Sequence, residues 1–301
     1  MKMVGKVKEK LYRFYCNHGI SMHSFKLRRE ESKKKFKDQL SIVCIAKYEE
    51  DYIEEWIRYH LLQGVDRIYV YDNESPDNMK QVLAPYIRSG KVVYNFIPGR
   101  GKQLEAYNDA IQKYKDCTKY MAFIDVDEFL VQEDASKSLI DTIEEIMNKD
   151  YWCGGIAVNW RVYGSSGHEL KPQGLVMENF LYRGDGLSKG NDCIKTIANP
   201  RFIQRYEHDH YPTYYLGFHN INENGRVVTS WFNLSEQTKF IRINHYFTKS
   251  KEEWILRRSR GKADTLDADD KRSIEEFYLH DNNIIYDDIM LPYARKIKSE
   301  N

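Results

Sequence analysis

The sequence predicts an α/β fold with a doubly wound, mostly parallel central sheet. From residue 40 onward, short apolar runs of strand length alternate with segments in which apolar residues recur at helical spacing. One run, residues 120–124, is apolar at every position, which is typical of a strand buried on both faces of a parallel sheet. The chain has 301 residues and is 42% hydrophobic, so it can form a core large enough for such a fold.

The first half of the chain contains the regular alternation. Strands are predicted over residues 40–46, 67–71, 92–96 and 120–124. Helices are predicted between them, over residues 53–60, 79–86 and 104–114. Repeated strand and helix units of this length imply a sheet with helices on both of its faces.

The second half departs from this rhythm. Residues 160–168 are rich in Gly and Ser, residues 178–192 are largely polar, and residues 206–215 are dense in Tyr and His. We therefore expect an irregular half, made of strands and long loops laid over the edge of the sheet. A β-like run at 240–243 and a helix over 251–260 follow, and the remaining residues are expected to be helical or irregular.

Charge is unevenly distributed along the chain. Residues 1–37 hold twelve Lys or Arg against three Glu, a net charge of +9, whereas residues 38–301 carry a net charge of −8. We divide the chain into a basic N-terminal segment (1–37), one large domain (38–265) and a charged C-terminal extension (266–301). The basic segment contains aromatic residues and suits either an anionic membrane surface or a solvated tail.

Cysteine usage and hydropathy bear on the location of the protein. The five cysteines are far apart and form no CxxC pair, which argues against a disulfide framework and a thiolate zinc site and fits a reducing cytoplasm. No apolar run approaches the roughly 20 residues that cross a bilayer. We expect a cytoplasmic protein, peripheral on the inner face of the membrane if the basic segment binds lipid, with no nucleic-acid partner.

The sharpest chemical feature is the carboxylate pair Asp125 and Asp127, directly after the apolar run 120–124. In an extended chain these two side chains point the same way, while Val126 points to the opposite face. Open α/β sheets bind ligands beyond the carboxyl ends of their strands, so a phosphate-bearing ligand is expected here. Two carboxylates repel a diphosphate unless a divalent cation lies between them. The pair therefore predicts a metal-dependent nucleotide site.

Two other interpretations of the pair are open at this point. The acids could cap a helix that begins after Phe129. An Asp-x-Asp phosphatase would use the first acid as its nucleophile. That class normally follows the pair with Gly and then Thr or Val, where this chain has Glu128 and Phe129.

A set of further motifs runs in order over residues 40–264. They are Lys47-Tyr-Glu-Glu with Glu55-Trp56-Ile57 and His60, Gly64-Val65, Tyr71-Asp72-Asn73-Glu-Ser, Gln103, Asp125-Val-Asp127-Glu-Phe, Trp160, Gly164-Ser-Ser-Gly167-His168, Lys195, Asn244-His245-Tyr-Phe-Thr-Lys249-Ser and Arg260-Gly261. In this ordered set the chain resembles the GT-A glycosyltransferases of the family-92 type, which are related to family 2.

The resemblance implies a nucleotide-sugar site and a metal site. The implied nucleotide-sugar-binding residues are Lys47, Asp72, Asn73, Gln103 and Asp125. The implied ligands of Mn²⁺ or Mg²⁺ are Asp125, Asp127 and His245, with His219 as a rival third ligand. An imidazole nitrogen among the ligands favours Mn²⁺.

The resemblance also implies an acceptor site and a proton acceptor. The expected acceptor-binding residues, an aromatic wall and a Gly-rich loop, are Trp160, Gly164, Ser165, Ser166, Gly167 and His168. No single catalytic base can be chosen, and the candidates are His168, Glu169, Asp185, Glu223 and Asp264.

The resulting functional hypothesis is a metal-dependent glycosyltransferase. The resemblance implies a UDP-linked donor, a hydroxyl acceptor on a glycan or lipid-linked glycan, inversion of configuration, and a role in surface-glycan biosynthesis. The alternatives are a non-catalytic sugar- or membrane-binding protein with a transferase-like fold, and the Asp-x-Asp phosphatase.

Overall fold

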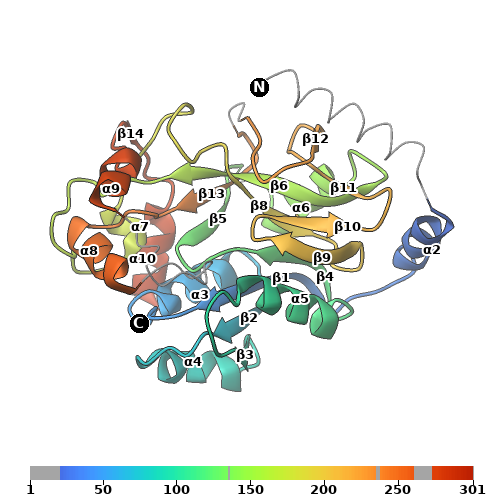
Figure 1. Ribbon diagram of the computed structural model, residues 1–301, viewed down its shortest axis with the longest axis horizontal. Helices are drawn as coiled ribbons and strands as arrows, with labels where there is room; N and C mark the ends of the chain where they lie inside the picture. The colour runs from blue at the N-terminus through green and yellow to red at the C-terminus, as the bar shows by residue number, and fades with distance from the viewer. Residues whose placement is uncertain (1–20, 135, 235–237, 261–272, 301) are drawn as a thin grey trace.

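The computed structural model describes residues 21–134, 136–234, 238–260 and 273–300 (Figure 1). The first half contains β1 (Asp38–Ala46), α3 (Ile53–Leu62), β2 (Arg67–Asp72), α4 (Met79–Arg88), β3 (Val92–Phe96), α5 (Gln103–Tyr114) and β4 (Thr118–Phe123). The four predicted strands and three predicted helices are therefore confirmed, each to within two residues at either end.

The other elements lie at the N-terminus and in the second half. They are α2 (Met22–Glu31), β5 (Glu128–Gln132), α6 (Leu139–Met147), β6 (Cys153–Val162), α7 (Val176–Asn179), β7 (Tyr182–Arg183), β8 (Ile194–Ala198), β9 (Ile203–His208), β10 (Tyr211–Tyr214), β11 (His219–Ile221), β12 (Val227–Val228), β13 (Ile241–His245), α8 (Lys251–Arg260), α9 (Ile274–His280), β14 (Ile285–Tyr286) and α10 (Leu291–Ser299).

Within the described residues, ten strands form one sheet in the order β12-β11-β6-β8-β4-β1-β2-β3, with β13 pairing with β6 and β5. The pairs β1 with β2, β2 with β3 and β1 with β4 are parallel, and so are β6 with β11 and β13. Strand β8 runs antiparallel between β4 and β6. The prediction of a mostly parallel sheet with β4 at its centre is confirmed.

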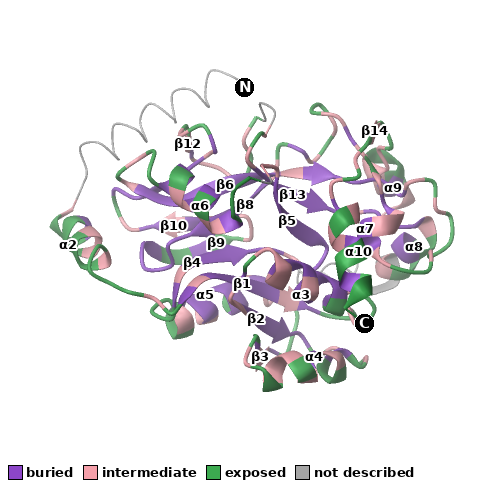
Figure 2. Cartoon of the chain, turned by 180° about the vertical axis from the view of Figure 1, so that it is seen from behind, coloured by how far each residue is buried: buried purple, intermediate pink, exposed green. Residues whose placement is uncertain are grey.

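Alternating side chains of the central strands build a core on each face of the sheet. In β1, Leu40, Ile42 and Cys44 pack with α3, α4 and α6, whereas Val43 packs on the opposite face with α5 and the β9-β10 hairpin. The central strands are buried, while α2 is mostly exposed (Figure 2). This arrangement is the doubly wound fold that the sequence predicts.

The structure after Asp127 contradicts one interpretation of the carboxylate pair, namely that the two acids cap a helix. Glu128 begins strand β5, which pairs antiparallel with β13 through Glu128 and His245. Strand β5 continues to Gln132 and the next described helix, α6, begins only at Leu139, so the suggestion that Asp125 and Asp127 cap a helix directly after Phe129 is wrong. The pairing instead brings His245 next to the residues that follow the pair.

Both ends of the described chain pack on the central domain. Ser24 of α2 is buried, and Glu31 binds the buried guanidinium of Arg201 at 2.6 Å. At the other end, Ala294 and Ile297 of α10 join the main core. The predicted boundaries at 37 and 265 stay predictions, and the second lies outside the described residues. The described residues contain no helix of the length and hydropathy needed to span a membrane.

Candidate active site

The candidate site lies where the parallel strands β1, β2 and β4 end. Ala46 of β1 pairs with Asp72 of β2, and Val43 pairs with Phe123 of β4, so the three carboxyl ends form one rim. Lys47, Asp72 and Asp125 follow or end these strands. The topology therefore brings residues from three separate motifs to one edge of the sheet, as the sequence predicts.

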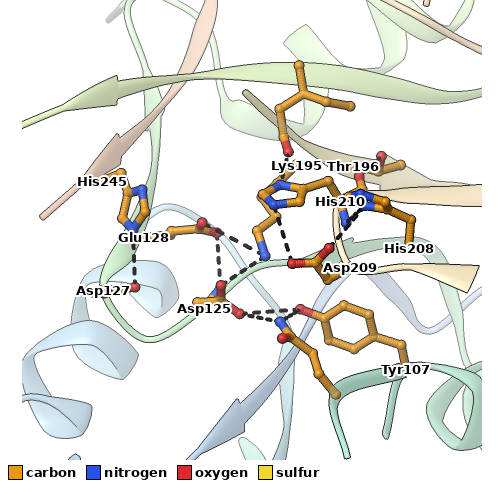
Figure 3. A network of polar contacts seen from close by, with 12 residues as sticks. Tyr107, Asp125, Asp127, Glu128, Lys195, Thr196, His208, Asp209, His210 and His245 are labelled. Atoms are coloured by element: carbon orange, nitrogen blue, oxygen red, sulfur yellow. Dashed lines mark hydrogen bonds and ion pairs between the residues drawn. The ribbon is translucent and has the colours of Figure 1, made fainter. Parts of the chain in front are cut away.

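Asp125 is held by side chains from two different parts of the fold (Figure 3). Its Oδ1 accepts hydrogen bonds from Gln103 Nε2 at 2.9 Å and from the Tyr107 hydroxyl at 3.4 Å, both on α5. Its Oδ2 lies 2.9 Å from the Nζ of Lys195 on β8. The orientation of this carboxylate is therefore fixed by protein groups on both of its oxygens.

Lys195 is a buried cation between two acids. Its side chain is only 1% exposed, and its Nζ also lies 3.9 Å from Oε1 of Glu128, which is fully buried. Burial works against the charged ammonium, but Asp125 and Glu128 raise the pKa of Lys195 well above its ordinary value. Burial also raises the pKa of Glu128 well above its usual value, and the charges of Asp125 and Asp127 add to this effect.

The two carboxylate oxygens of Asp127 contact different side chains. Oδ2 accepts a hydrogen bond from Arg257 Nη2 of α8 at 3.0 Å, and Oδ1 lies 3.6 Å from His245 Nε2. Burial alone would raise the pKa of Asp127, but His245 and Arg257 hold the pKa of this carboxyl well below its usual value. Asp127 is therefore an anion in a largely enclosed position.

The two carboxylates do not share the geometry expected from an extended chain. The stretch between β4 and β5 is a turn at Val126 and Asp127, so alternation of side chains along a strand does not apply. As a result, Asp125 faces Lys195 and Asp127 faces His245 (Figure 3).

The chemistry of these donors fits a divalent cation at Asp127 and His245. Two adjacent ligands of an octahedral cation at about 2.1 Å from the metal lie about 3 Å apart, close to the observed 3.6 Å between Oδ1 and Nε2. Arg257 occupies only the other oxygen. In the described part of the chain, no three His, Cys, Asp or Glu side chains group in a way that could hold a metal. A metal ion here would thus have two ligands among the described side chains, Asp127 and His245.

At the end of β2, two of the candidate residues also shape the loops around the rim. Asp72 accepts hydrogen bonds from the Ser75 amide at 2.8 Å and the Tyr94 hydroxyl at 2.7 Å. Asn73 donates to the carbonyls of Ile97 and Gly99 at 2.8 and 2.7 Å, which ties the turn after β2 to the loop after β3. The Lys47 side chain, by contrast, is exposed.

Of the predicted acceptor residues, Trp160 lies near His245, whereas residues 164–166 contact the C-terminal segment. The Trp160 ring lies 4.2 Å from the His245 ring, between centroids, so this tryptophan is at the site. Gly164 lies against the C-terminal segment, where a Cβ would come within 2.4 Å of Asn283 Oδ1. The amides of Ser165 and Ser166 donate to Asp281 and Asn283 at 2.6 and 2.8 Å. These two amides are therefore committed to the C-terminal segment.

Gly167 and His168 complete the Gly-rich loop. Gly167 has φ +80 and has open space where a side chain would stand. His168 Nε2 lies 3.1 Å from the carbonyl of Asn179, and its ring contacts Phe180.

The candidate bases are scattered, and several have structural partners. Glu223 accepts hydrogen bonds from three consecutive amides, at Lys239, Phe240 and Ile241. Glu169 pairs with Lys251 at 3.1 Å. Asp185 accepts from the Ser188 hydroxyl at 2.9 Å and the Leu187 amide at 3.0 Å. Asp264 lies outside the described residues.

His219 is remote from the carboxylate pair. It aligns with Cys153 at the first residue of β6, whereas His245 aligns with Val162 at the last. At about 3.3 Å per residue these positions are roughly 30 Å apart. His219 instead lies 3.1 Å from Asp150. The structure thus brings His245, and not the rival His219, to Asp127.

Sequence reasoning assigned no role to several residues of the site. Lys195 was part of a motif, but only the structure shows its contact with Asp125. Asp209 lies 3.0 Å from His208 Nδ1 and 3.3 Å from His210 Nε2, beside the Lys195 side chain (Figure 3). The cluster of His and Asp at 208–210 was a visible signal, but nothing in the sequence linked it to residue 125.

Comparison with known proteins matches the sequence to one family. The sequence profile of Glycosyltransferase family 92 matches residues 40–267. A Glycosyltransferase family 92 protein of Oryza sativa subsp. japonica is 26% identical over 53% of this chain and 27% of its own length. The Beta-1,4-galactosyltransferase galt-1 of Caenorhabditis elegans is 33% identical over 32% of this chain and 25% of its own. The chain thus spans about a quarter of the length of these two relatives.

A solved structure, S. aureus TarS 1-349 in complex with UDP-GlcNAc, is similar over 55% of this chain and 46% of that chain, with 16% identity and a TM-score of 0.36. The profile match covers most of the chain and includes the rim, the carboxylate pair and His245. The chain belongs to glycosyltransferase family 92.

Proposed function

We propose that this chain transfers a galactosyl unit from a UDP-linked donor to a hydroxyl group of a glycan acceptor, with a divalent metal ion bound at Asp127 and His245. The proposal depends on one observation: one carboxylate oxygen of Asp127 binds Arg257, while the other lies beside His245. This arrangement leaves one anionic oxygen beside an imidazole nitrogen, next to the strand ends where nucleotides bind.

Asp127 Oδ1 and His245 Nε2 would hold Mn²⁺, or Mg²⁺ in its place. When bound, this ion supplies positive charge that stabilises the diphosphate leaving group. Arg257 balances the charge of Asp127 and fixes the direction of its second oxygen. The imidazole nitrogen favours Mn²⁺ over Mg²⁺.

On the donor side, Asp125 would bind the nucleotide-sugar through the exposed part of its side chain, which is 33% exposed. Lys195 and Gln103 orient that carboxylate, so it needs little reorganisation when the donor arrives. Asp72 and Lys47 are proposed contacts of the nucleoside. Asn73 supports them through its bonds to the loop after β3.

On the acceptor side, Trp160 would contact the sugar that receives the new unit, because its ring adjoins His245. To the five earlier candidates for the base we add Asp209, whose carboxylate lies beside Lys195 and two imidazoles. Asp209 would take the proton from the attacking hydroxyl.

Two relatives support galactose as the transferred sugar. One is the Beta-1,4-galactosyltransferase galt-1 of Caenorhabditis elegans. The other is the Galactan beta-1,4-galactosyltransferase GALS3 of Arabidopsis thaliana, 31% identical over 31% of this chain. Formation of a β linkage from an α-linked sugar nucleotide requires inversion, so we propose a single inverting displacement.

We further propose a cytoplasmic location and a role in surface-glycan biosynthesis, with the basic residues 1–37 binding an anionic membrane. The described cysteines Cys44, Cys117, Cys153 and Cys193 are unpaired, in keeping with a reducing compartment.

The direct test is a donor screen with the purified chain. UDP-galactose, UDP-glucose and UDP-GlcNAc are each incubated with Mn²⁺ and a set of glycan acceptors, and UDP release is measured with and without EDTA. We expect release from UDP-galactose that EDTA abolishes. Release from none of the donors with any acceptor would contradict the proposal, and EDTA-resistant transfer would contradict its metal.

A further inference from the structure

A line of aromatic rings leads outward from His245. The centroids of His245 and Trp160 are 4.2 Å apart, those of Trp160 and His210 are 5.0 Å apart, and those of His210 and Trp231 are 6.5 Å apart. These four rings, which we call the aromatic track, come from β13, β6, the β9-β10 turn and the loop that follows β12. Four segments that are distant in sequence thus converge on a path that starts at the candidate metal ligand.

The outer end of the track is exposed. Trp231 and its neighbour Phe232 are each 44% exposed, and Leu234 is 70% exposed. The His208 ring lies parallel to the Trp231 ring within 5°, with centroids 6.1 Å apart. A cluster of exposed aromatic side chains on a folded domain marks a binding surface more often than a single exposed residue does.

The exposed end is fixed relative to the carboxylate pair. The Trp231 carbonyl accepts a hydrogen bond from the Ile194 amide at 3.1 Å, and Phe232 forms a β-bridge with Cys193. Ile194 precedes Lys195, whose ammonium binds Asp125. The loop is therefore bonded to the start of β8, which holds Trp231 at a defined distance from the site.

Polar groups along the track suit a ligand with hydroxyl groups. Among the described residues, the buried Nε1 of Trp160 and Nδ1 of His245 have no hydrogen-bond partner. Asp209 and His208 stand beside the exposed rings and can accept or donate further bonds. Burial, with Lys195 as a further cause, lowers the pKa of His210 to about 4, so its ring is neutral at physiological pH. The negative charge of Asp209 disfavours an anionic ligand.

We infer that the aromatic track is an acceptor subsite, which binds a neutral glycan several sugar units long as it extends away from the reacting hydroxyl. The C–H face of a hexopyranose packs on an aromatic ring, while its hydroxyls bond to groups at the ring edge. Trp231 binds a sugar unit remote from the one that reacts. This inference rests on the proposed function, because the direction of the acceptor is taken from the metal site.

The experiment compares Trp231→Ala and Trp231→Tyr with the unaltered chain on an array of neutral and anionic glycans, with UDP and Mn²⁺ present. Tyr151→Ala is the matched control, since Tyr151 is an exposed aromatic residue at 59% that contacts Trp152 and Arg28 and not the track. We expect binding of neutral oligosaccharides that improves with chain length. Trp231→Ala should weaken it about tenfold or more, while Trp231→Tyr and Tyr151→Ala keep it.

Four outcomes would overturn the subsite: no binding of neutral glycans by the unaltered chain, equal binding by Trp231→Ala, a preference for anionic glycans, or a change only in self-association measured by sedimentation. UDP binding in the absence of glycan separates this inference from the proposed function. If the unaltered chain fails to bind UDP with Mn²⁺, the proposed function fails. If it binds UDP and Trp231→Ala leaves glycan binding unchanged, only the subsite fails.

Discussion

The Nζ of Lys195 lies 2.9 Å from Oδ2 of Asp125, so the first carboxylate of the pair is already neutralised by the protein. The same ammonium faces the buried Glu128 at 3.9 Å. Asp127, in contrast, keeps one oxygen turned to His245. The two acids of the motif therefore have different electrostatic partners, which is consistent with different roles in donor and metal binding.

Lys195→Met should destabilise the fold, because it leaves Asp125 and the buried Glu128 without their cation. Because the Asp125 side chain is 33% exposed, the loss of free energy of unfolding should reach at most about 3 kcal/mol, the value for breaking a buried ion pair. Urea unfolding followed by circular dichroism measures it. Lys119→Met is the control, since Lys119 forms a half-exposed pair with Glu144 that is worth at most about 1 kcal/mol. A loss at Lys195 no larger than at Lys119 would contradict this account.

Glu55 should make stability depend on pH. Burial raises the pKa of Glu55 to about 7, although its carboxylate accepts the amides of Val176 and Met177. The pKa of Glu55 is higher in the folded state than in the unfolded state, so protonation of Glu55 stabilises the fold. This contribution to the free energy of unfolding is fully present below about pH 4. It is lost as the pH rises through about 7.

The measurement for Glu55 is urea unfolding of the unaltered chain and Glu55→Gln from pH 4 to pH 8. The difference in their free energy of unfolding should shift by about 3 kcal/mol in favour of Glu55→Gln across this range. Glu54→Gln, at the exposed neighbouring position, should show no such trend. A pH-independent difference for Glu55→Gln would show that this carboxyl titrates normally.

Glu223→Gln should reduce stability and leave catalysis intact. The three amides at 239–241 lose an anionic acceptor, which costs about 1–3 kcal/mol. The rate constant kcat of the folded variant should stay within about twofold of the unaltered value. A loss of about a hundredfold or more in kcat would instead identify Glu223 as the catalytic base.

Shortening the basic segment should have two distinct effects. Removal of residues 1–20 should weaken salt-sensitive binding to anionic vesicles and leave UDP affinity unchanged. Removal of residues 1–37 should also cost about 3 kcal/mol in stability, because it deletes Glu31 and Phe36, which contact the buried Arg201. Vesicle binding that is indifferent to both deletions would exclude the membrane role.

Much of the sheet was predictable because its strands are continuous apolar runs bounded by glycines and polar turns. The carboxylate pair could be placed at a strand end for the same reason. The contact of Lys195 with Asp125 could not be predicted, since β8 inserts antiparallel between β4 and β6 from 70 residues further along the chain. The spacing of apolar residues within β8 does not indicate which strands it pairs with.

The acceptor residues expected from the sequence stay predictions. One of them, Trp160, adjoins His245. The exposed ring of Trp231 and the 208–210 cluster gave no local signal of their position, because turns and loops bring them next to each other. The common direction expected for the Asp125 and Asp127 side chains assumed an extended chain, whereas the chain turns at Val126 and Asp127.

The most direct test of the central claim is isothermal titration of UDP into Asp127→Asn in the presence of Mn²⁺. Asn preserves side-chain volume but leaves Arg257 without its anion, so a stability loss of up to about 3 kcal/mol is expected in a folded protein. Asp150→Asn, which alters the remote pair with His219, is the matched control. We predict that Asp127→Asn loses Mn²⁺-dependent UDP binding and transfer while Asp150→Asn keeps both. Native UDP and Mn²⁺ affinity in folded Asp127→Asn would contradict the assigned site.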